Sequence, residues 1–411
     1  MTPALRTILF GGLRPVLSLD FANGVYRNAS GSWSNPADVG LTCTRSTVAN
    51  DVTNGGVILP FAANVPRIVP GRGLGAWEAT TNLIRNPRGE GLTTGVIGSG
   101  GAYPTNWSAS SGASSFTITV VGSGVADGIP YIDLRLQSAS ASTSVAFRSE
   151  TSSGAAVAAS TAYTGSVWAS YVAGSVANVT AAYAQVETFG GAGSTGGGST
   201  PPSAGAMQRL SVVPATTPVG ATFARTNLVL SFTPGAAVDI TIRYGGFQLV
   251  QKSFLVPPLW PPSGIGAATY NADNNTVPDV IAAGQDFTID NVTELPGTTG
   301  VAQFLFDHHD GTDNNRIYCE RTSTGNLRPQ VVIGGVSTLI GFVAKTGART
   351  VITRISRSGN VYSFWADGAL IGSQTLPGMP ALSGLQIGAR RQALFPLNGY
   401  TQSHVHYPRA L

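Results

Sequence analysis

The sequence predicts an all-β fold, made of successive antiparallel β-sandwich or jelly-roll domains with a β-rich N-terminal segment. Apolar and polar residues alternate within short runs such as 115–120, 131–136 and 238–244, which places every second side chain on the same face of a strand. Helical spacing of apolar residues over a dozen positions is nearly absent from the sequence. The 52 glycines and 25 prolines among 411 residues suit short strands joined by tight turns.

The amount and distribution of charge argue against a nucleic-acid partner. Charged residues make up 11% of the chain, against about a quarter in ordinary soluble domains, so uncharged polar side chains must cover most of the surface. The formal net charge of +4 is spread along the chain, and the arginines form no run that follows a phosphate backbone. We therefore expect no nucleic-acid partner.

Cysteine use and the first residues bear on the compartment. Cys43 and Cys319 lie far apart in the sequence, so we expect buried free thiols rather than a disulfide framework or a zinc site. Arg6 and Arg14 interrupt the apolar stretch near the N-terminus, which argues against a secretory signal and against a membrane span. We expect neither export by the general secretory route nor membrane insertion.

Two boundaries divide the chain. A new pattern of strands begins near Asn86 and Pro87, and the four prolines between residues 256 and 264 remove backbone donors that a central strand needs. These boundaries predict four segments, which are a β-rich N-terminal region at 1–85, a jelly roll at 86–256, an extended Pro-rich connector at 257–264 and a sandwich at 265–411.

The N-terminal region carries an ordered set of motifs. Residues 44–47 read Thr-Arg-Ser-Thr, residues 63–67 read Ala-Asn-Val-Pro-Arg, and residues 73–83 read Gly-Leu-Gly-Ala-Trp-Glu-Ala-Thr-Thr-Asn-Leu. This succession resembles a segment of phage and prophage structural proteins. The resemblance implies a fibre, spike or tail component of a tailed phage or of a phage-derived, gene-transfer-agent-like particle. Such a protein attaches to the virion, is assembled in the host cytoplasm and is released by lysis.

A structural role explains the same residues without a ligand. Arg45, Arg67 and Glu78 can form salt bridges across packed loops, and Trp77 can anchor a core or a subunit interface. We favour this interpretation over ligand binding for these four side chains.

The middle region resembles a carbohydrate-binding jelly roll. The resemblance rests on the strand from Asn82 to Asn86, the Asn106–Trp107 pair, Trp168 within its strand and the final strand at 245–249. Modules of this type often hold a structural calcium through an acidic residue in the last strand. Gly246 and Phe247 occupy that place here, which leaves Glu90 as the calcium ligand that the resemblance can supply.

The last region resembles a laminin-G-like or concanavalin-like sandwich. The residues that carry the resemblance are the strand 351–356, the hairpin 362–372, the strand 385–388 and the closing segments 397–400 and 407–411. Asp367-Gly368 at the tip of alternating strands is a strong hairpin signal. The resemblance indicates a fold and leaves the ligand open.

A lectin needs aromatic platforms for the flat faces of sugar rings and polar groups that bind hydroxyls. In the middle region we choose Trp107, Trp168, Tyr183 and Gln185 as candidate glycan-binding residues. The alternative is that a jelly roll of this length buries both tryptophans, which we favour for Trp168 and weigh equally for Trp107.

The run 307–316 gathers Asp, His and Asn residues. Asp307, Asp310 and Asp313 are candidate calcium ligands, and His308 and His309 are candidates for a transition metal. Adjacent histidines on an extended segment point to opposite faces, so a solvated hairpin loop is the favoured interpretation. No cofactor is required by the sequence, and calcium is the metal that we expect if one is bound.

The sequence favours binding over catalysis. The 20 acidic residues give no evident carboxylate pair for glycoside hydrolysis, and the motifs of serine hydrolases, zinc proteases and phosphate-binding loops are absent. We therefore expect a non-enzymatic virion surface protein, such as a head spike, tail fibre or tail-tip component, that attaches to host cell-surface polysaccharide. Its other expected partners are virion proteins and further copies of itself, for example in a trimer that multiplies weak sites.

Two rival functions remain open at the level of sequence. One is a polysaccharide-degrading tailspike, which requires an acidic pair in a cleft. The other is a purely structural head or tail decoration, in which the lectin-like folds only pack against their neighbours.

Overall fold

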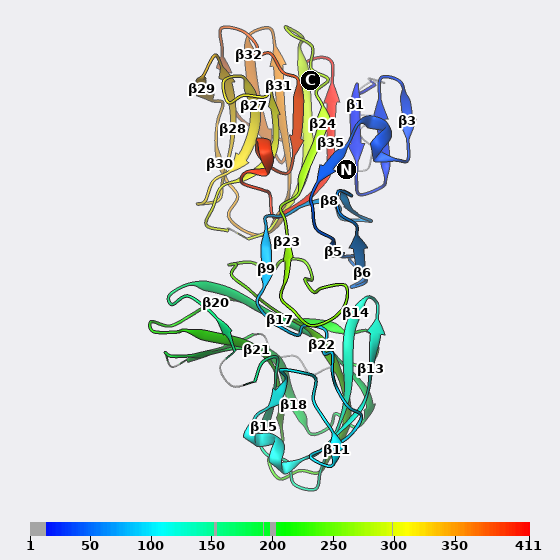
Figure 1. Cartoon of the computed structure of the whole chain (residues 1–411). Coiled ribbons are helices and arrows are strands. Elements are labelled where there is room, and N and C mark those ends of the chain that lie inside the picture. Colours follow the sequence, from blue (N-terminus) through cyan, green and yellow to red (C-terminus); the bar gives the residue numbers. More distant parts are fainter. Residues whose placement is uncertain (1–13, 152–153, 192, 198–202, 298) are drawn as a thin grey trace. The chain divides into compact units, whose positions relative to one another are not determined.

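The computed structural model describes residues 14–151, 154–191, 193–197, 203–297 and 299–411 (Figure 1). Within these ranges the helical elements are three short 3-10 helices, and all other regular structure is β-strand, which confirms the all-β prediction. The helices are η1 (Pro36–Val39), η2 (Ser111–Ser115) and η3 (Arg391–Ala393). The chain forms two compact units. Unit 1 takes the described residues up to Ala49 together with Phe61–Ala79 and Asn271–Leu411, and unit 2 takes Asn50–Pro60 and Thr80–Tyr270.

Unit 1 contains a ten-stranded antiparallel sheet. Its main path runs β3 (Gly31–Trp33), β2 (Val25–Asn28), β1 (Leu17–Asp20), β35 (Gly399–Tyr407), β25 (Phe287–Leu295), β31 (Arg349–Ser358), β32 (Val361–Ala366) and β33 (Ala369–Thr375). β8 (Gly73–Ala76) also pairs with β35, and β7 (Arg67–Val69) pairs with β8. At the predicted hairpin between β32 and β33, Asp367 and Gly368 both have positive φ, at 50° and 88°.

An eight-stranded sheet forms the second layer of unit 1. Its order is β29 (Val336–Leu339), β28 (Asn326–Ile333), β27 (Arg316–Arg321), β26 (Gln303–His309), β34 (Gly384–Ile387), β24 (Asn274–Pro278) and β4 (Thr42–Thr44), with β30 (Val343–Ala344) paired to β28. Alternate residues of both sheets meet in one core, where Phe287 and Ile289 join Phe306 and Ile317. Unit 1 is therefore a β-sandwich.

The strands of the N-terminal region complete the sheets of the C-terminal region. β1 pairs with β35, so that Leu17 lies opposite His406, and β4 pairs with β24, so that Cys43 lies opposite Asn275. The predicted segments 1–85 and 265–411 therefore do not form separate units. The sequence pattern predicted the strands, but it contains no signal for pairing between residues several hundred positions apart.

A buried ion-pair network also joins these segments of unit 1. Arg45 Nη1 lies 2.6 Å from Asp273 Oδ1, and Arg67 Nη2 lies 3.0 Å from Asp273 Oδ2, with all three side chains fully buried. The backbone N–H of Trp77 donates to Asp273 Oδ2 at 3.0 Å. Arg45 also donates to three backbone carbonyls, so its charge is satisfied locally. The expected structural role of Arg45 and Arg67 is confirmed.

Unit 2 is a second β-sandwich. Its seven-stranded sheet runs β11 (Gly100–Gly101), β10 (Gly95–Ile97), β13 (Thr117–Ala126), β14 (Ile129–Ser138), β22 (Val238–Val250), β17 (Ala162–Gly174) and β20 (Gln208–Thr216). The facing six-stranded sheet runs β12 (Ser108–Ala109), β15 (Ser144–Arg148), β21 (Phe223–Phe232), β18 (Val179–Phe189) and β19 (Gly193–Gly196), with β16 (Ala155–Ala156) paired to β21. Two small pairs remain, which are β9 (Thr80–Asn82) with β23 (Ala268–Tyr270) and β5 (Ala49–Val52) with β6 (Ile58–Phe61).

The first half of the Pro-rich segment packs against unit 2. Leu259 and Trp260 are buried, and the Trp260 ring meets the Trp168 ring edge to face at 5.4 Å. The backbone groups of the segment are paired as well, since Asn82 Nδ2 donates to the Leu259 carbonyl at 2.7 Å and the Leu259 N–H donates to Gln248 Oε1 at 3.2 Å. Residues 257–260 thus belong to unit 2, and side-chain amides supply the hydrogen-bond partners that a sheet ladder would otherwise provide.

Candidate functional site

Two of the four predicted glycan-binding residues lie in the core. Trp107 is 4% exposed, and its ring packs on Phe247 at 4.8 Å while its Nε1 donates to the Asn86 carbonyl at 2.8 Å. Trp168 is 2% exposed and packs against Trp260. Neither indole can offer a face to a sugar, so this part of the prediction was wrong. The core role that we weighed for both tryptophans is the observed one.

Tyr183 and Gln185 lie on the outer face of the six-stranded sheet. In β18 the neighbours Ala182, Ala184 and Val186 are buried in the core, whereas Tyr183 and Gln185 are partly exposed. This alternation follows from the period of two residues in a strand. Both predicted side chains are therefore accessible and point to the same side of the sheet.

Strand pairing brings further polar residues beside Gln185. In β21 Asn227 lies opposite Gln185, in β15 Arg148 lies opposite Asn227, and in β12 Ser108 lies opposite Arg148. Neighbouring strands are about 4.8 Å apart, so these four residues form a row about 14 Å long across the sheet. We call this row, with Tyr183, Glu187 and Arg225 beside it, the polar sheet face.

Hydrogen bonds fix one side of the polar sheet face. Asn227 Nδ2 donates to Gln185 Oε1 at 3.0 Å and to Glu187 Oε2 at 2.8 Å, and Arg225 Nε donates to the same Glu187 oxygen at 2.9 Å. Burial alone would raise the pKa of Glu187, but the hydrogen bonds from Arg225 and Asn227 and the charges of Arg225 and Arg148 outweigh it and lower that pKa. Glu187 is thus an anion that accepts hydrogen bonds at neutral pH.

The other side of the face has unused hydrogen-bonding capacity. Arg148 approaches Glu187 Oε2 only to 3.7 Å, and its buried Nε has no hydrogen-bond partner among the described residues. The buried Oδ1 of Asn227, in the adjacent position of the row, has no partner there either. Leaving such a group unpaired costs about 1–3 kcal/mol, so native proteins usually pair it with protein, water or ligand. Asn227 is itself fully buried, whereas the Arg148 side chain is 26% exposed, so Arg148 is the group of this pair that a polar ligand can reach.

The face contains groups of the kinds that sugars require. Arginine and amide nitrogens donate to hydroxyl oxygens, the Glu187 carboxylate accepts from hydroxyl groups, and the Tyr183 ring offers an apolar surface. The Tyr183 ring lies close to β19, where a Cβ added to Gly196 would come within 3.2 Å of it. Glu150, two residues beyond Arg148, is fully buried, accepts a hydrogen bond from the Arg85 backbone N–H at 2.8 Å and is paired with the Arg85 guanidinium.

The predicted calcium ligands do not come together. Asp307 is buried and accepts two hydrogen bonds from Arg316, at 2.9 and 2.7 Å, while Asp310 accepts from Thr312 within its own loop. Asp313 is paired with arginines, and Glu90, which belongs to unit 2, lies 3.0 Å from Arg88 Nε. In the described part of the chain we find no group of three or more His, Cys, Asp or Glu arranged to hold a metal.

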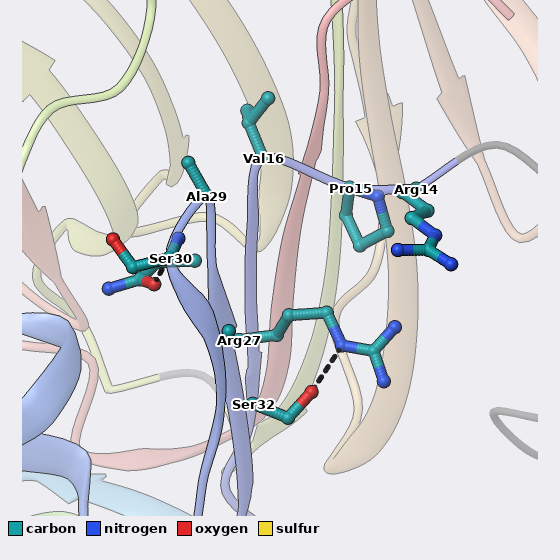
Figure 2. Close-up of a pocket in the computed structure, with 9 residues that line it drawn as sticks. Arg14, Pro15, Val16, Arg27, Ala29, Ser30 and Ser32 are labelled. Atoms are coloured by element: carbon teal, nitrogen blue, oxygen red, sulfur yellow. Dashed lines mark hydrogen bonds between the residues drawn. The ribbon is translucent and has the colours of Figure 1, made fainter.

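A separate hollow of about 540 Å³ lies in unit 1 beside β1, β2 and β3 (Figure 2). Arg14 and Arg27 contribute the charges of its lining, and Arg27 Nε donates to Ser32 Oγ at 2.9 Å. Its described lining contains no aromatic ring. The hollow thus lacks the stacking surface that the polar sheet face has.

The chain matches no protein-family model and no curated protein. Among solved structures, the CBM40 of the Ruminococcus gnavus IT-sialidase is 16% identical and covers 31% of this chain and 79% of that chain, with a TM-score of 0.28. The NanB sialidase of Streptococcus pneumoniae is 12% identical over 32% of this chain and 23% of that chain, with a TM-score of 0.27. A pentraxin of Limulus polyphemus is 14% identical over 32% and 67%, with a TM-score of 0.25. Similarities this low carry no functional argument.

Among the described residues, no helix has the length and the apolar character that crossing a bilayer requires.

Proposed function

We propose that this chain is a non-enzymatic glycan-binding protein and that the polar sheet face of unit 2 binds the saccharide. The observation that supports this best is the row formed by Arg148, Asn227 and Gln185, in register across three strands, in which the partly exposed Arg148 has an Nε without a hydrogen-bond partner among the described residues. Strands hold side chains in a fixed geometry, so a ligand that supplies hydroxyl groups binds there without ordering the site first.

A glycan array tests this function with the full chain. We expect selective binding to a small set of glycans, and the Gln185→Ala variant should bind them roughly tenfold more weakly because one amide of the row is lost. The matched control is Gln137→Ala, which removes a glutamine from the other sheet of unit 2, where Gln137 binds Asp239. Equal loss in both variants, or no selective binding by the wild-type chain, would refute a glycan site on this face.

The absence of catalysis is a separate part of the proposal. Prolonged incubation with a polysaccharide that the chain binds should leave the length distribution of that polysaccharide unchanged in size-exclusion chromatography. Shortened products that persist after repurification of the protein would make the chain a depolymerase instead.

The biological setting that we propose is the surface of a virion. The motifs at 44–47, 63–67 and 73–83 support a fibre, spike or tail component of a tailed phage or phage-derived particle, and the low content of charged residues suits an uncharged polar surface. In that setting the ligand is host surface polysaccharide, and a homo-oligomer such as a trimer multiplies weak single-site contacts.

Antibodies raised against the chain test this location. Immunogold particles should decorate the outside of purified phage particles, at the tail or at the head. Purified particles that contain none of the chain by mass spectrometry would contradict the virion role and leave the glycan-binding proposal standing.

A further inference from the structure

We propose a second ligand site in unit 1, which binds a sugar that carries a carboxylate. It is formed by Asp313, Arg390, Arg391, Leu394 and Phe395, which we call the Phe395 patch. It shares no residue with the polar sheet face and does not depend on the function proposed for that face.

The backbone of this patch is held in an unusual conformation. Between β34 and β35, the residues Gln392, Ala393, Phe395 and Asn398 have φ of 64°, 58°, 48° and 53°, which is a region that residues other than glycine rarely adopt. Such conformations persist only where the surrounding structure enforces them, and they concentrate at ligand sites. Backbone hydrogen bonds hold this segment in its conformation. The Arg390 N–H donates to the Leu394 carbonyl at 2.8 Å, and the Phe304 N–H donates to the Phe395 carbonyl at 3.0 Å.

The enforced backbone presents apolar side chains to solvent. Phe395 is 44% exposed and Leu394 is 48% exposed. The Phe395 ring stacks on Phe304 at 6.1 Å, and Phe304 stacks on Tyr318 at 5.1 Å, with both of these inner rings buried. The outer ring is therefore a fixed platform, which the C–H face of a sugar can cover at little entropic cost.

Guanidinium groups gather beside the platform. Arg316 is committed to the buried carboxylate of Asp307, whereas Arg390 and Arg391 share the half-exposed Asp313, at 2.8 Å and 3.6 Å. The Arg390 guanidinium also lies 6.0 Å from the centre of the Phe395 ring. The cluster has three guanidinium groups and two carboxylates, so it keeps an excess positive charge.

Arg391 is the group with the least complete pairing. Its guanidinium reaches Asp313 only at 3.6 Å, and its buried Nε has no hydrogen-bond partner within the described ranges. A carboxylate can form two parallel hydrogen bonds with such a planar fork. Next to it, Asp313 can accept hydrogen bonds from sugar hydroxyl groups while Phe395 packs on the ring of the same sugar.

This combination favours an acidic sugar over other ligands. A neutral sugar would leave Arg391 with only its 3.6 Å contact to Asp313, and a small inorganic anion would not use the Phe395 ring. A nucleic-acid strand could stack on Phe395, but it needs a track of cations along its backbone, and here Asp313 lies among the arginines.

Saturation-transfer NMR on the full chain tests the site with three probes, the methyl glycosides of glucuronate, galacturonate and N-acetylneuraminate. The matched neutral probe for each is its methyl ester. We expect saturation transfer from the protein to at least one acid, with a signal much weaker for its ester. Arg391→Gln and Phe395→Ala should each weaken the affinity roughly tenfold. Arg328→Ala, which removes an exposed arginine of the eight-stranded sheet, should leave it unchanged, as should Arg135→Ala in unit 2.

Several results would overturn this second site. Saturation transfer to none of the three acids would overturn it, as would equal transfer to an acid and its ester. Displacement of the acid by a single-stranded oligonucleotide, at a concentration below that of the acid, would also overturn it. Loss of acid binding in Arg148→Ala with retention in Arg391→Gln would place the acidic sugar on the polar sheet face instead. Near-UV circular dichroism of each variant verifies that the fold is intact.

Discussion

At the scale of single residues, the environment of a side chain decides its role more than its type does. Trp107 and Tyr183 are both aromatic residues of unit 2 that a lectin could use, yet Trp107 is buried against Tyr244 and Phe247 while Tyr183 reaches solvent. The sequence around Trp107 has no long alternating run that would reveal its direction. Tyr183 lies inside such a run, so its exposure could be predicted.

Trp107→Ala should therefore act on stability and not on ligand contact. Removing a buried tryptophan typically costs about 3–5 kcal/mol, because it creates a cavity and here also leaves the Asn86 carbonyl without its indole donor. Urea unfolding followed by circular dichroism measures this loss. The glycan affinity of the folded variant should equal that of the wild type. A variant of unchanged stability that no longer binds glycan would show that Trp107 belongs to the binding site.

At the scale of elements, strand register creates the polar sheet face. Arg148 ends the alternating run at 144–148, on the face opposite to Val145 and Phe147, so its outward direction was readable from the sequence. The position of Arg148 beside Asn227 and Gln185 could not be read from the sequence, because it depends on pairing between strands that lie roughly 40 to 80 residues apart. Sequence reasoning thus found Tyr183 and Gln185 and missed Arg148, Glu187, Arg225 and Asn227.

Strand β35 carries an element-scale prediction about pH. Its residues His404 and His406 are buried beside His308 of β26, whose Nδ1 donates a hydrogen bond to Asp279 Oδ2 at 2.7 Å. Burial, and then the proximity of His308, lowers the pKa of His406 to about 3 and lowers that of His404 as well. In the unfolded chain both should titrate near 6.5, so below that pH the unfolded state binds more protons.

The stability of unit 1 should consequently be complete above about pH 6.5 and fall as the pH drops towards 3, by up to about 1.4 kcal/mol per pH unit for each histidine. Urea unfolding at a series of pH values measures the slope, and His406→Gln should reduce it. A free energy of unfolding that stays constant between pH 7 and pH 4 would contradict the buried, uncharged state of these histidines.

At the scale of the whole molecule, the two units differ in how much of their architecture is local in sequence. Both large sheets of unit 2 come from one continuous stretch, which agrees with the jelly roll expected in the middle of the chain. Unit 1 is assembled from both ends of the chain. Its strands were predictable from alternation, but the pairing of β1 and β8 with β35 was not, since no local residue pattern encodes a partner so distant.

This difference predicts how fragments behave. A fragment of residues 265–411 lacks β1, β4 and β8, which leaves the edges of β24 and β35 unpaired and should prevent a stable fold. A fragment of residues 80–270 keeps both large sheets and should fold. Proton–nitrogen NMR spectra compare them, and well-dispersed signals with cooperative unfolding from 265–411 alone would show that the N-terminal strands are dispensable.

The most direct test of the central claim is the affinity of Arg148→Ala for the glycan that the wild-type chain selects on the array, measured by calorimetry beside Arg135→Ala. Arg135 is an exposed arginine on the other sheet of unit 2, paired with Asp239. The polar sheet face predicts that Arg148→Ala binds at least roughly tenfold more weakly while Arg135→Ala binds as the wild type does. Equal affinities for all three proteins would contradict the assignment of the glycan site to this face.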